Sequence, residues 1–521
     1  MNTLIHKFSD IINGVITGFD RIVFKGSIMP LMHEEGAASF CIRHRILNKD
    51  FKDWMLKQTA GIVDDAERFS VEHRDQSVQY ISSSSLRKES IAHDHQCLKN
   101  ISSGLIGIWS AVESCVTFKA RFDKTATYPK LSRQWSKCKH LYFYYDHKDY
   151  GFMNIRLQTW FPYHIQIAMN GREWLRRSLE KSGIDHNVIG NKFTSISDYQ
   201  KAQQFLDVQR NTHWEKILNG FLSEVFPSMN KVLGDGLSYY WTLWQSELAT
   251  DLIFDSPQQI DPFRDTLLRY ALMTGGMTNV MRYMDRPLTA KGKPRATCAD
   301  TFKGRSKSFN DGICLRFWLN SNSVKIYNEA NVLRIESTVN QSSMFKAHRH
   351  KVGDSSDTPK KLRPLRKSVA DTALVAAKSQ EVNNRFMNQL AQCKDETPAS
   401  KIFDDVCCAK IKNSKRVRAL DLTGKDRALI QAISTPKFCV SGMTNRTLRS
   451  ILEGEPGYKG KSVKQLSSKV TRQFRQLRDH GLIKKVAGQN RYTLTSKGQQ
   501  LTAVLSAALS ASTQQLMKIA A

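Results

Sequence analysis

Residues 461–498 read KSVKQLSSKVTRQFRQLRDHGLIKKVAGQNRYTLTSKG, and this stretch carries the most specific pattern of the chain. Apolar residues recur in it at steps of three, four and seven, the spacing of one face of a helix. These residues are Val463, Leu466, Val470, Phe474 and Leu477. Gly481 follows where a helix C-terminus is expected. Leu482–Val486 and Arg491–Thr495 then read as two short strands, so the stretch predicts a helix followed by a β-hairpin.

Basic residues lie off the apolar stripe and on the hairpin, the layout of a winged helix-turn-helix. The segment LRDHGLIKKV followed by RYTLTSKGQQL resembles the MarR/ArsR-type families of bacterial winged-helix regulators. The resemblance implies DNA binding, often with dimerisation; the alternative is a domain that binds RNA or protein, or that merely packs on the rest of the protein. We expect contacts to nucleic acid from Lys469, Arg472, Arg475, Arg478, Lys485 and Arg491, with Lys464 beside them.

The charge of the chain indicates a polyanionic partner. Its 78 Lys and Arg residues exceed its 48 Asp and Glu residues by 30, and nucleic acid is the usual partner of such an excess. Duplex DNA is the expected form, with RNA or single-stranded DNA as alternatives. The Gly/Pro-containing loop 286–308 adds a basic cluster. Its expected contact residues are Lys291, Lys293, Arg295, Lys303 and Arg305.

The length of 521 residues is enough for two to four domains. Apolar runs are too short to span a membrane, and residues 1–15 lack the layout of a signal peptide, so no membrane partner is expected. The ten cysteines form no C-x-x-C pair, which argues against a zinc ribbon and suits a reducing cytoplasm.

The predicted fold is a multidomain α+β protein with a mixed or antiparallel sheet core, helices and the winged helix. Short strands are expected at 141–145, 152–159 and 163–169, and again at 312–320, 323–327 and 332–339. Helices are expected at 51–74, 172–182, 200–255 and 368–392. The expected division is 1–130, an N-terminal α/β region; 131–349, a sheet core; 350–421, a basic linker and helix; and 422–521, the winged helix.

The segment SVKIYNEANVLRIESTVN (323–340) resembles a pattern in rolling-circle replication initiators, where a strand ends in Tyr-Asp-Lys and the next carries Arg-x-Glu. Here Asn328 and Glu329 replace the Asp and Lys. The resemblance implies a site at Glu336 with Tyr145 or Tyr327 as nucleophile. The simpler interpretation of Arg334 and Glu336 is a cross-strand ion pair on a solvated face.

Carboxylates next to apolar runs offer a different site. Asp20, Glu113 and Asp146 each flank a strand-like run, and converging carboxylates can hold Mg²⁺ or Mn²⁺ for phosphodiester chemistry. Glu247 and Asp251, four residues apart on the expected helix, would share one face. The alternative is that each carboxylate serves only as a cap, turn residue or ion-pair partner.

Aromatic residues are dense between 142 and 163 and alternate with Lys and Arg. One face of Leu141–Tyr145 could therefore stack single-stranded bases, although core packing on both faces is an equal alternative. Two functions remain open: a metal-dependent nuclease or strand-transfer protein of a bacterial mobile element, targeted by the winged helix, or a non-catalytic regulator or ribonucleoprotein component.

Overall fold

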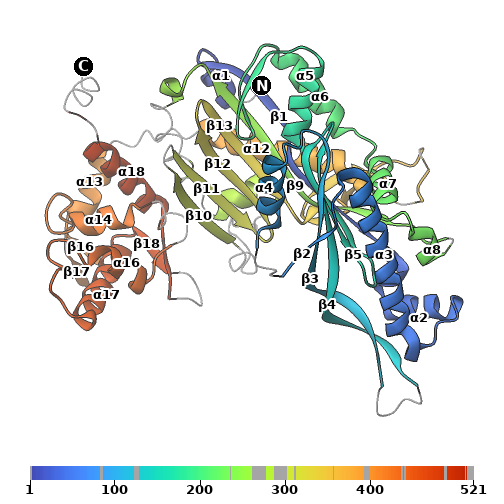
Figure 1. Cartoon of the computed structure of the whole chain (residues 1–521). Coiled ribbons are helices and arrows are strands. Elements are labelled where there is room, and N and C mark those ends of the chain that lie inside the picture. Colours follow the sequence, from blue (N-terminus) through green and yellow to red (C-terminus); the bar gives the residue numbers. More distant parts are fainter. Residues whose placement is uncertain are drawn as a thin grey trace. The chain divides into compact units, whose positions relative to one another are not determined.

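A computed structural model describes residues 3–512. It leaves out residues 83–85, 123–127, 235, 261–270, 272–276, 287–301, 310–311, 352, 356, 392–398, 413, 436–437, 439–441, 486–489 and 511. The chain forms two compact units, each assembled from separated segments. Unit 1 comprises Met1–Asn13, Asp251–Ser337 and Glu381–Ala521, and unit 2 comprises Gly14–Thr250 and Thr338–Gln380. The fold is mixed α/β (Figure 1).

Unit 2 is built on a sheet with strand order β9-β1-β6-β5-β4-β3-β2. The strands are β1 (Ile12–Ser27), β2 (Gln79–Ile81), β3 (Gly104–Arg121), β4 (Lys130–His147), β5 (Gly151–Gln158), β6 (Ile165–Asn170) and β9 (Tyr240–Phe254). The pairs β1–β6, β6–β5, β5–β4 and β4–β3 are antiparallel. Strand β2 runs parallel to β3 and covers only Trp109–Ala111, so the sheet is mixed.

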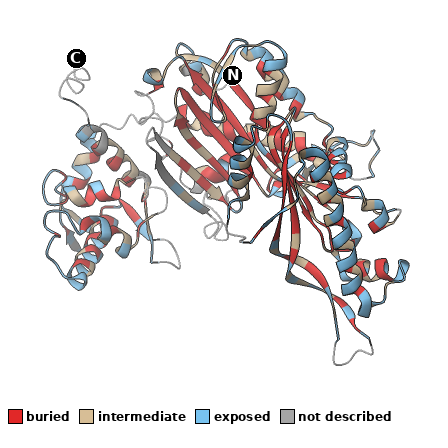
Figure 2. Cartoon of the chain, in the orientation of Figure 1, coloured by how far each residue is buried: buried red, intermediate tan, exposed pale blue. Residues whose placement is uncertain are grey.

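Helices and short hairpins complete unit 2. They are α2 (Glu34–Arg43), α3 (Phe51–Arg74), α4 (Lys88–Leu98), α5 (Gly171–Lys181), α6 (Tyr199–Arg210), α7 (Trp214–Val225), α8 (Met229–Leu233), β7 (His186–Ile189), β8 (Lys192–Ile196), β14 (Lys346–Arg349) and β15 (Lys361–Pro364). Helix α12 (Thr372–Ala391) begins in this unit. Helix α3 packs along β3, as Figure 1 shows. The strands are largely buried and the outer helix faces exposed (Figure 2).

The two faces of the central strands differ in chemistry. Alternate residues of a strand point to opposite faces. On one face lie Ile22, Phe24, Ile155, Ile167 and Phe143, all buried, and α3 and α7 supply rings against them: Phe69 against Phe143, and Trp214 against Phe24. The other face is polar along β5, where Asn154, Arg156 and Gln158 alternate with these apolar residues.

In unit 1 the strand order is β10-β11-β12-β13, with the last residues of β9 beside β13. The bounds are β10 (Phe302–Phe309), β11 (Gly312–Leu319), β12 (Asn322–Glu329), β13 (Val332–Val339), α1 (Thr3–Lys7) and α10 (Met277–Tyr283). Every residue of β13 is buried. Arg334 of β13 forms a two-pronged ion pair with Asp251, at 2.6 and 2.8 Å, and both side chains are wholly buried.

The C-terminal part of unit 1 has a hydrophobic core that runs from Ile402 to Leu505. Its elements are α13 (Ala399–Cys407), β16 (Lys410–Lys412), β17 (Lys415–Val417), α14 (Arg427–Ile433), α16 (Asn445–Leu452), α17 (Val463–Asp479), β18 (Ile483–Lys485), β19 (Tyr492–Leu494) and α18 (Ser496–Ser510). Strands β18 and β19 form an antiparallel hairpin. The predicted helix followed by a hairpin is therefore confirmed.

Most predicted elements are confirmed, and one large element is wrong. The strands expected at 141–145, 152–159, 163–169, 312–320, 323–327 and 332–339 and the helices expected at 51–74, 172–182 and 368–392 are present. The region 200–255, expected to be helical, contains the three helices α6, α7 and α8 up to Leu233, and residues 240–254 form strand β9. The Tyr, Trp and Thr content of β9 favours a strand, and its run Leu248–Phe254 is buried at every position, which a period of 3.6 cannot explain.

Three smaller expectations also need correction. Residues 350–367, expected as a linker, include β15, which pairs with β14. A domain boundary at 130 would separate β3 from β4, which pair along their full length. Tyr142 and Tyr144 are buried among Trp109, Ile106 and Ala92, and the opposite face is buried too, so this strand is not a stacking platform.

The Arg334–Asp251 ion pair should be a major determinant of the stability of unit 1. Replacing Arg334 by Leu removes the guanidinium that binds the buried Asp251 carboxylate, which should lower the free energy of unfolding by about 3–5 kcal/mol. Chemical denaturation followed by circular dichroism measures this. Arg305→Leu, at an exposed position on β10, is the matched control. Equal stabilities of the two variants would contradict the prediction.

Candidate functional site

The antiparallel register brings the polar residues of several strands of unit 2 onto one face. Lys25 of β1 lies opposite Gln166 of β6, Gln166 opposite Arg156 of β5, and Arg156 opposite Tyr142 of β4. Directly paired residues point to the same face. Asn154, two residues before Arg156, shares that face. The polar side chains of β5 and of its neighbouring strands therefore form a row across one face of the sheet.

A first pocket, of about 320 Å³, opens on this part of unit 2, and oxygen-bearing side chains form part of its lining. It includes Asp20, Glu247, Asn154, Asn170 and Asn191. Carboxylate oxygens of Asp20 and Glu247 lie within 4.8 Å of each other. Asn191 donates a hydrogen bond to Asp20 at 2.7 Å, and Gln245 donates one to Glu247 at 2.7 Å. Carboxylate and amide oxygens are the ligands that hard cations such as Mg²⁺ prefer.

A second pocket, of about 430 Å³, adjoins the first and is cationic. Arg21, Arg87, Lys88 and Arg156 line it, together with Tyr142, Tyr144, Gln166, Glu89 and Asn154. Arg21, Glu89 and Asn154 line both pockets, so the two are adjacent. A pair of carboxylates beside a group of guanidinium ions is an arrangement that can take an anion together with a divalent cation.

Glu113 of β3 forms ion pairs with two cations of the second pocket. Its carboxylate accepts hydrogen bonds from Lys88 and Arg156, each at 2.8 Å. Burial raises the pKa of Glu113, but the hydrogen bonds from Lys88 and Tyr142 and the charge of Arg156 outweigh this effect and hold the pKa below its ordinary value. Glu113 therefore stays ionised and fixes two of the cations that face the pocket.

The structure does not bring the three predicted metal ligands together. Asp20 lines the first pocket. Glu113 is paired with Cys138 of β4, and Asp146 lies eight residues farther along that strand, about 26 Å away at the usual rise per residue. Asp146 instead accepts hydrogen bonds from Arg177 at 2.6 Å and from Gln96 at 2.9 Å. Asp20 has a second carboxylate of its unit, Glu247, beside it.

Glu247 and Asp251 are not a helical pair, because both lie on strand β9. The expectation that Arg334 and Glu336 lie on a solvated face is also wrong. Arg334 binds Asp251, and Glu336 accepts a contact from Lys325 at 2.8 Å. Both residues are wholly buried, so they do not lie on a solvated face.

The two candidate tyrosine nucleophiles lie in different surroundings. Tyr145 of β4 is buried, and desolvation together with the charge of Glu224 raises its pKa well above the ordinary value, which disfavours the phenolate. Tyr327 of β12 is half-buried, and the Lys325 ammonium lies 4.9 Å from the centre of its ring. Tyr145 lines neither of the two pockets of unit 2.

Helix α17 presents an exposed polar face opposite its buried stripe. Leu466, Val470, Phe474 and Leu477 are buried as predicted, whereas Val463, the first residue of the helix, is 63% exposed. The exposed face consists of Lys464, Ser468, Thr471, Arg472, Arg475 and Arg478. Ser462 caps the N-terminus in a capping box with Gln465.

The junction between α17 and the hairpin is well defined. Gly481 has φ +75° and follows the C-cap residue His480. The amide of Leu482 donates to Leu477 and that of Gly481 to Arg478, which is the Schellman pattern. Phe474 stacks on Tyr492 of β19 with ring centres 4.4 Å apart. These contacts fix the exposed Lys484, Lys485 and Arg491 relative to α17.

Other residues expected to contact nucleic acid differ in their surroundings. Lys469 points inward: it donates to the Gly457 carbonyl at 2.8 Å and lies 3.8 Å from the ring centre of Tyr458. Lys303 and Arg305 are exposed on β10. Lys291, Lys293 and Arg295 lie outside the described residues.

Sequence reasoning missed the arginines of the second pocket and a Cys/Cys/His cluster on β3 and β4. The alternation N-I-R-L-Q in β5 could have located Arg156, and the alternation C-K-H at 138–140 could have located part of the cluster. The partners come from other strands, and their pairing is not readable from one sequence.

Comparisons of the chain with protein-family models, with curated proteins and with solved structures found no match. Within the described ranges, no helix is both long enough and apolar enough to cross a membrane.

Replacing Glu113 by Gln should lower stability in a pH-dependent way. The folded-state pKa of Glu113 lies below its unfolded value, so its contribution is present above about pH 4.5 and is lost as the pH falls through the folded-state pKa. We expect a loss of about 1–3 kcal/mol at pH 7, because Lys88 and Arg156 lose a charged acceptor. Urea unfolding of both proteins between pH 3 and pH 7 tests this, and a difference that does not shrink at low pH contradicts it.

Proposed function

We propose that this protein binds nucleic acid, with duplex DNA as the expected form, through α17 and the β18–β19 hairpin. The observation that carries the proposal is the exposed face of α17, where Arg472, Arg475 and Arg478 stand beside Ser and Thr hydroxyls. Arginine recognises guanine and phosphate through paired hydrogen bonds, and hydroxyls bond to phosphate or to bases.

The charge of the C-terminal region supports the proposal. Residues 422–521 contain 17 Lys and Arg against 4 Asp and Glu, so 13 of the 30 excess positive charges fall in less than a fifth of the chain. Each phosphate that such a surface neutralises releases counterions, and binding then depends steeply on salt.

The order of elements supports a winged-helix arrangement for this region. Helices α14, α16 and α17 are followed by β18 and β19, and Met443 between α14 and α16 forms a bridge with Tyr492 of β19. In a winged helix the last of the three helices enters the major groove and the hairpin lies on the adjacent backbone. In this proposal α17 enters the major groove, and Lys484, Lys485 and Arg491 of the hairpin contact the adjacent backbone.

Replacing both Arg472 and Arg475 by Ala should weaken binding of duplex DNA by roughly 10- to 1000-fold, because a base contact contributes about 1–3 kcal/mol and a phosphate contact also steepens the salt dependence. Fluorescence anisotropy across a salt series measures both effects. The control Arg43→Ala/Lys57→Ala removes the same charge from exposed positions on α2 and α3. Equal affinities of the two double variants would refute docking through α17.

A second function, metal-dependent phosphodiester chemistry, is favoured by the two adjacent pockets of unit 2. Asp20 and Glu247 would hold Mg²⁺ or Mn²⁺, whose charge compensates the attacking and leaving oxygens of a phosphodiester. Arg21, Arg87 and Arg156 line the adjoining pocket and are placed to bind a phosphate there. Asn191 orients the Asp20 carboxylate through its hydrogen bond. If this chemistry is absent, the protein is a non-catalytic nucleic-acid-binding protein.

Asp20→Asn should abolish metal-dependent cleavage of labelled DNA or RNA, with a loss of at least about 100-fold on a denaturing gel. It should also weaken Mn²⁺ binding measured by calorimetry, a readout independent of turnover. Asp64→Asn, at an exposed position on α3, is the control and should change neither. Free product ends indicate hydrolysis, whereas a covalent adduct indicates a tyrosine nucleophile. If the wild-type protein forms neither product with Mg²⁺ or Mn²⁺, it has no cleavage activity, and only the nucleic-acid-binding function remains.

A further inference from the structure

Three metal-ligating side chains meet in the middle of the β3–β4 hairpin of unit 2. Cys138 and His140 are two residues apart on β4 and therefore share a face. Cys115 of β3 lies opposite Ser136, two residues before Cys138, so its side chain points to that same face. The register alone thus places two thiols and one imidazole side by side.

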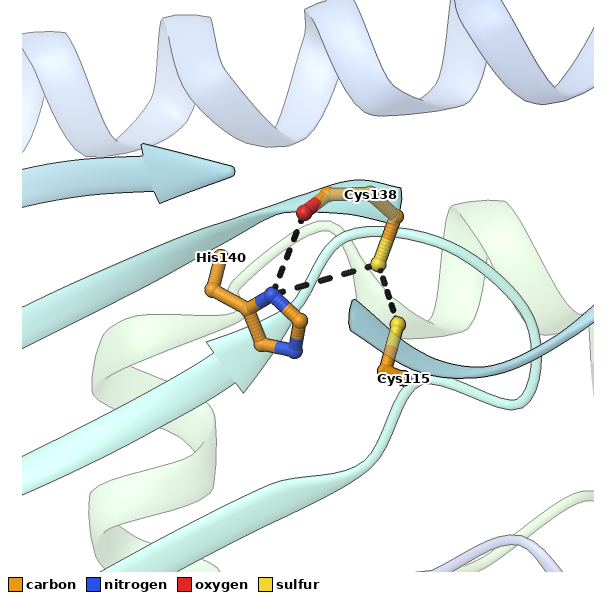
Figure 3. Close-up of side chains that lie close together, drawn as sticks. All are labelled: Cys115, Cys138 and His140. Carbon is orange, nitrogen blue, oxygen red and sulfur yellow. Dashed lines mark hydrogen bonds between the residues drawn. The ribbon is translucent and has the colours of Figure 1, made fainter. Parts of the chain in front are cut away.

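The geometry of the cluster is compact (Figure 3). The two sulfurs are 2.8 Å apart, and His140 Nδ1 is 3.9 Å from Cys138 Sγ. One ligand atom from each residue lies within 4.8 Å of those of the other two. The side chains are shielded, since Cys115 and Cys138 are each 8% exposed and His140 is 2% exposed. Figure 3 shows the nitrogen-bearing edge of His140 facing the sulfurs.

We propose that Cys115, Cys138 and His140 bind one thiophilic divalent cation, with zinc as the expected ion. Zinc takes sulfur at about 2.3 Å and histidine nitrogen at about 2.0–2.1 Å in tetrahedral sites. Donors that already lie within 4.8 Å of one another reach such an ion by small side-chain rotations. Three protein ligands leave the fourth position for water.

The identity of the donors selects this class of ion. Two thiolates and an imidazole form a soft to borderline set, which suits zinc and disfavours Mg²⁺ and Ca²⁺. His140 also has the outer contact that metal-binding histidines commonly make, because its Nδ1 lies 3.2 Å from the Cys138 carbonyl oxygen. A hydrogen bond donated by Nδ1 to that carbonyl leaves Nε2 to bind the metal.

A metal explains the cluster better than a disulfide does. Cys115 and Cys138 are diagonal rather than directly opposed, and diagonal Cα atoms of an antiparallel pair are about 7–8 Å apart. A disulfide usually requires Cα atoms less than about 7 Å apart. Two sulfurs at about 2.3 Å from one tetrahedral zinc lie about 3.8 Å apart, so the sulfurs would separate slightly to bind the ion. The ion also gives His140 a role that a disulfide would not.

The bound ion would join the two long strands of the hairpin at their midpoint. Strands β3 and β4 each contain 18 residues. Cys115 and Cys138 lie between the residues packed with Ala92 of α4, such as Trp109 and Ala111, and the outer residues, where Phe118 and Leu131 are buried. A cross-link at this position restrains the outer half of the hairpin in addition to its hydrophobic contacts.

The test is titration of the full-length, metal-free protein with Co²⁺, which occupies zinc sites and absorbs strongly when thiolates ligate it. One equivalent should produce a thiolate-to-cobalt charge-transfer band, and Zn²⁺ should displace it. Cys138→Ser should abolish the band and weaken Zn²⁺ binding by more than about tenfold. Cys97→Ser, at an exposed cysteine of α4, is the matched control and should leave both unchanged.

Circular dichroism checks that Cys138→Ser is folded, and Cys115→Ser is the second variant if it is not. Absence of a charge-transfer band in the wild-type protein overturns the proposal whatever the variants do. A band of equal strength in a folded Cys138→Ser or Cys115→Ser protein overturns it as well. So does a Cys115–Cys138 disulfide in peptide maps of protein prepared under reducing conditions, because oxidised sulfurs cannot ligate the ion.

Discussion

The backbone register of the antiparallel strands β3-β4-β5-β6-β1 is the constraint on which the rest of unit 2 depends. Each pairing fixes which side chains stand next to each other, and a slip of one residue would send a strand's apolar residues to the polar face. The buried residues of the opposite face, such as Phe143, Ile155 and Ile167, oppose any such slip. Hydrophobic packing on one face therefore holds the polar groups of the other face in place.

Concentrating cations on that face has an electrostatic cost, and the structure offsets it locally. Lys88 and Arg156 would repel each other across the pocket, and the Glu113 carboxylate accepts from both at 2.8 Å. Arg21 is 3.7 Å from Glu89. The acidic pair Asp20 and Glu247 carries the opposite problem, which is relieved in part by hydrogen bonds from Asn191 and Gln245. In each pocket, groups of like charge therefore lie close together, and hydrogen bonds or ion pairs within unit 2 offset their repulsion.

Sequence periodicity predicted most helices and strands correctly, because it depends only on residues that are neighbours along the chain. The 3.6-residue spacing of Leu466, Val470 and Leu477 located α17, and the alternation around Asn154 and Arg156 was sufficient for β5. Periodicity failed at β9, where residues 248–254 are buried on both faces and give no alternating signal.

The sites were harder to predict than the elements. Asp20 was identified from its position beside an apolar run, but Glu247 was assigned to a helix. Glu113 and Asp146 were grouped with Asp20, although pairing along β4 separates them and ion pairs engage both. Which strands are neighbours is set by long-range packing, and a single sequence does not contain it in readable form. The Cys115–Cys138 contact was missed for the same reason, since 23 residues separate its members.

The short strand β2 has a consequence for the behaviour of the protein at high concentration. It pairs with only three residues of β3, and in the described part of the chain no other strand lies beside β3 on that side. An uncovered strand edge is a template for pairing with another chain, the first step of aggregation. Lys119 and Arg121 are exposed on this segment, and Lys130 lies opposite Arg121 on β4. Repulsion between these cations on two copies of the protein opposes pairing of their strand edges. The same excess positive charge that would attract a polyanion thus also keeps copies of the protein apart.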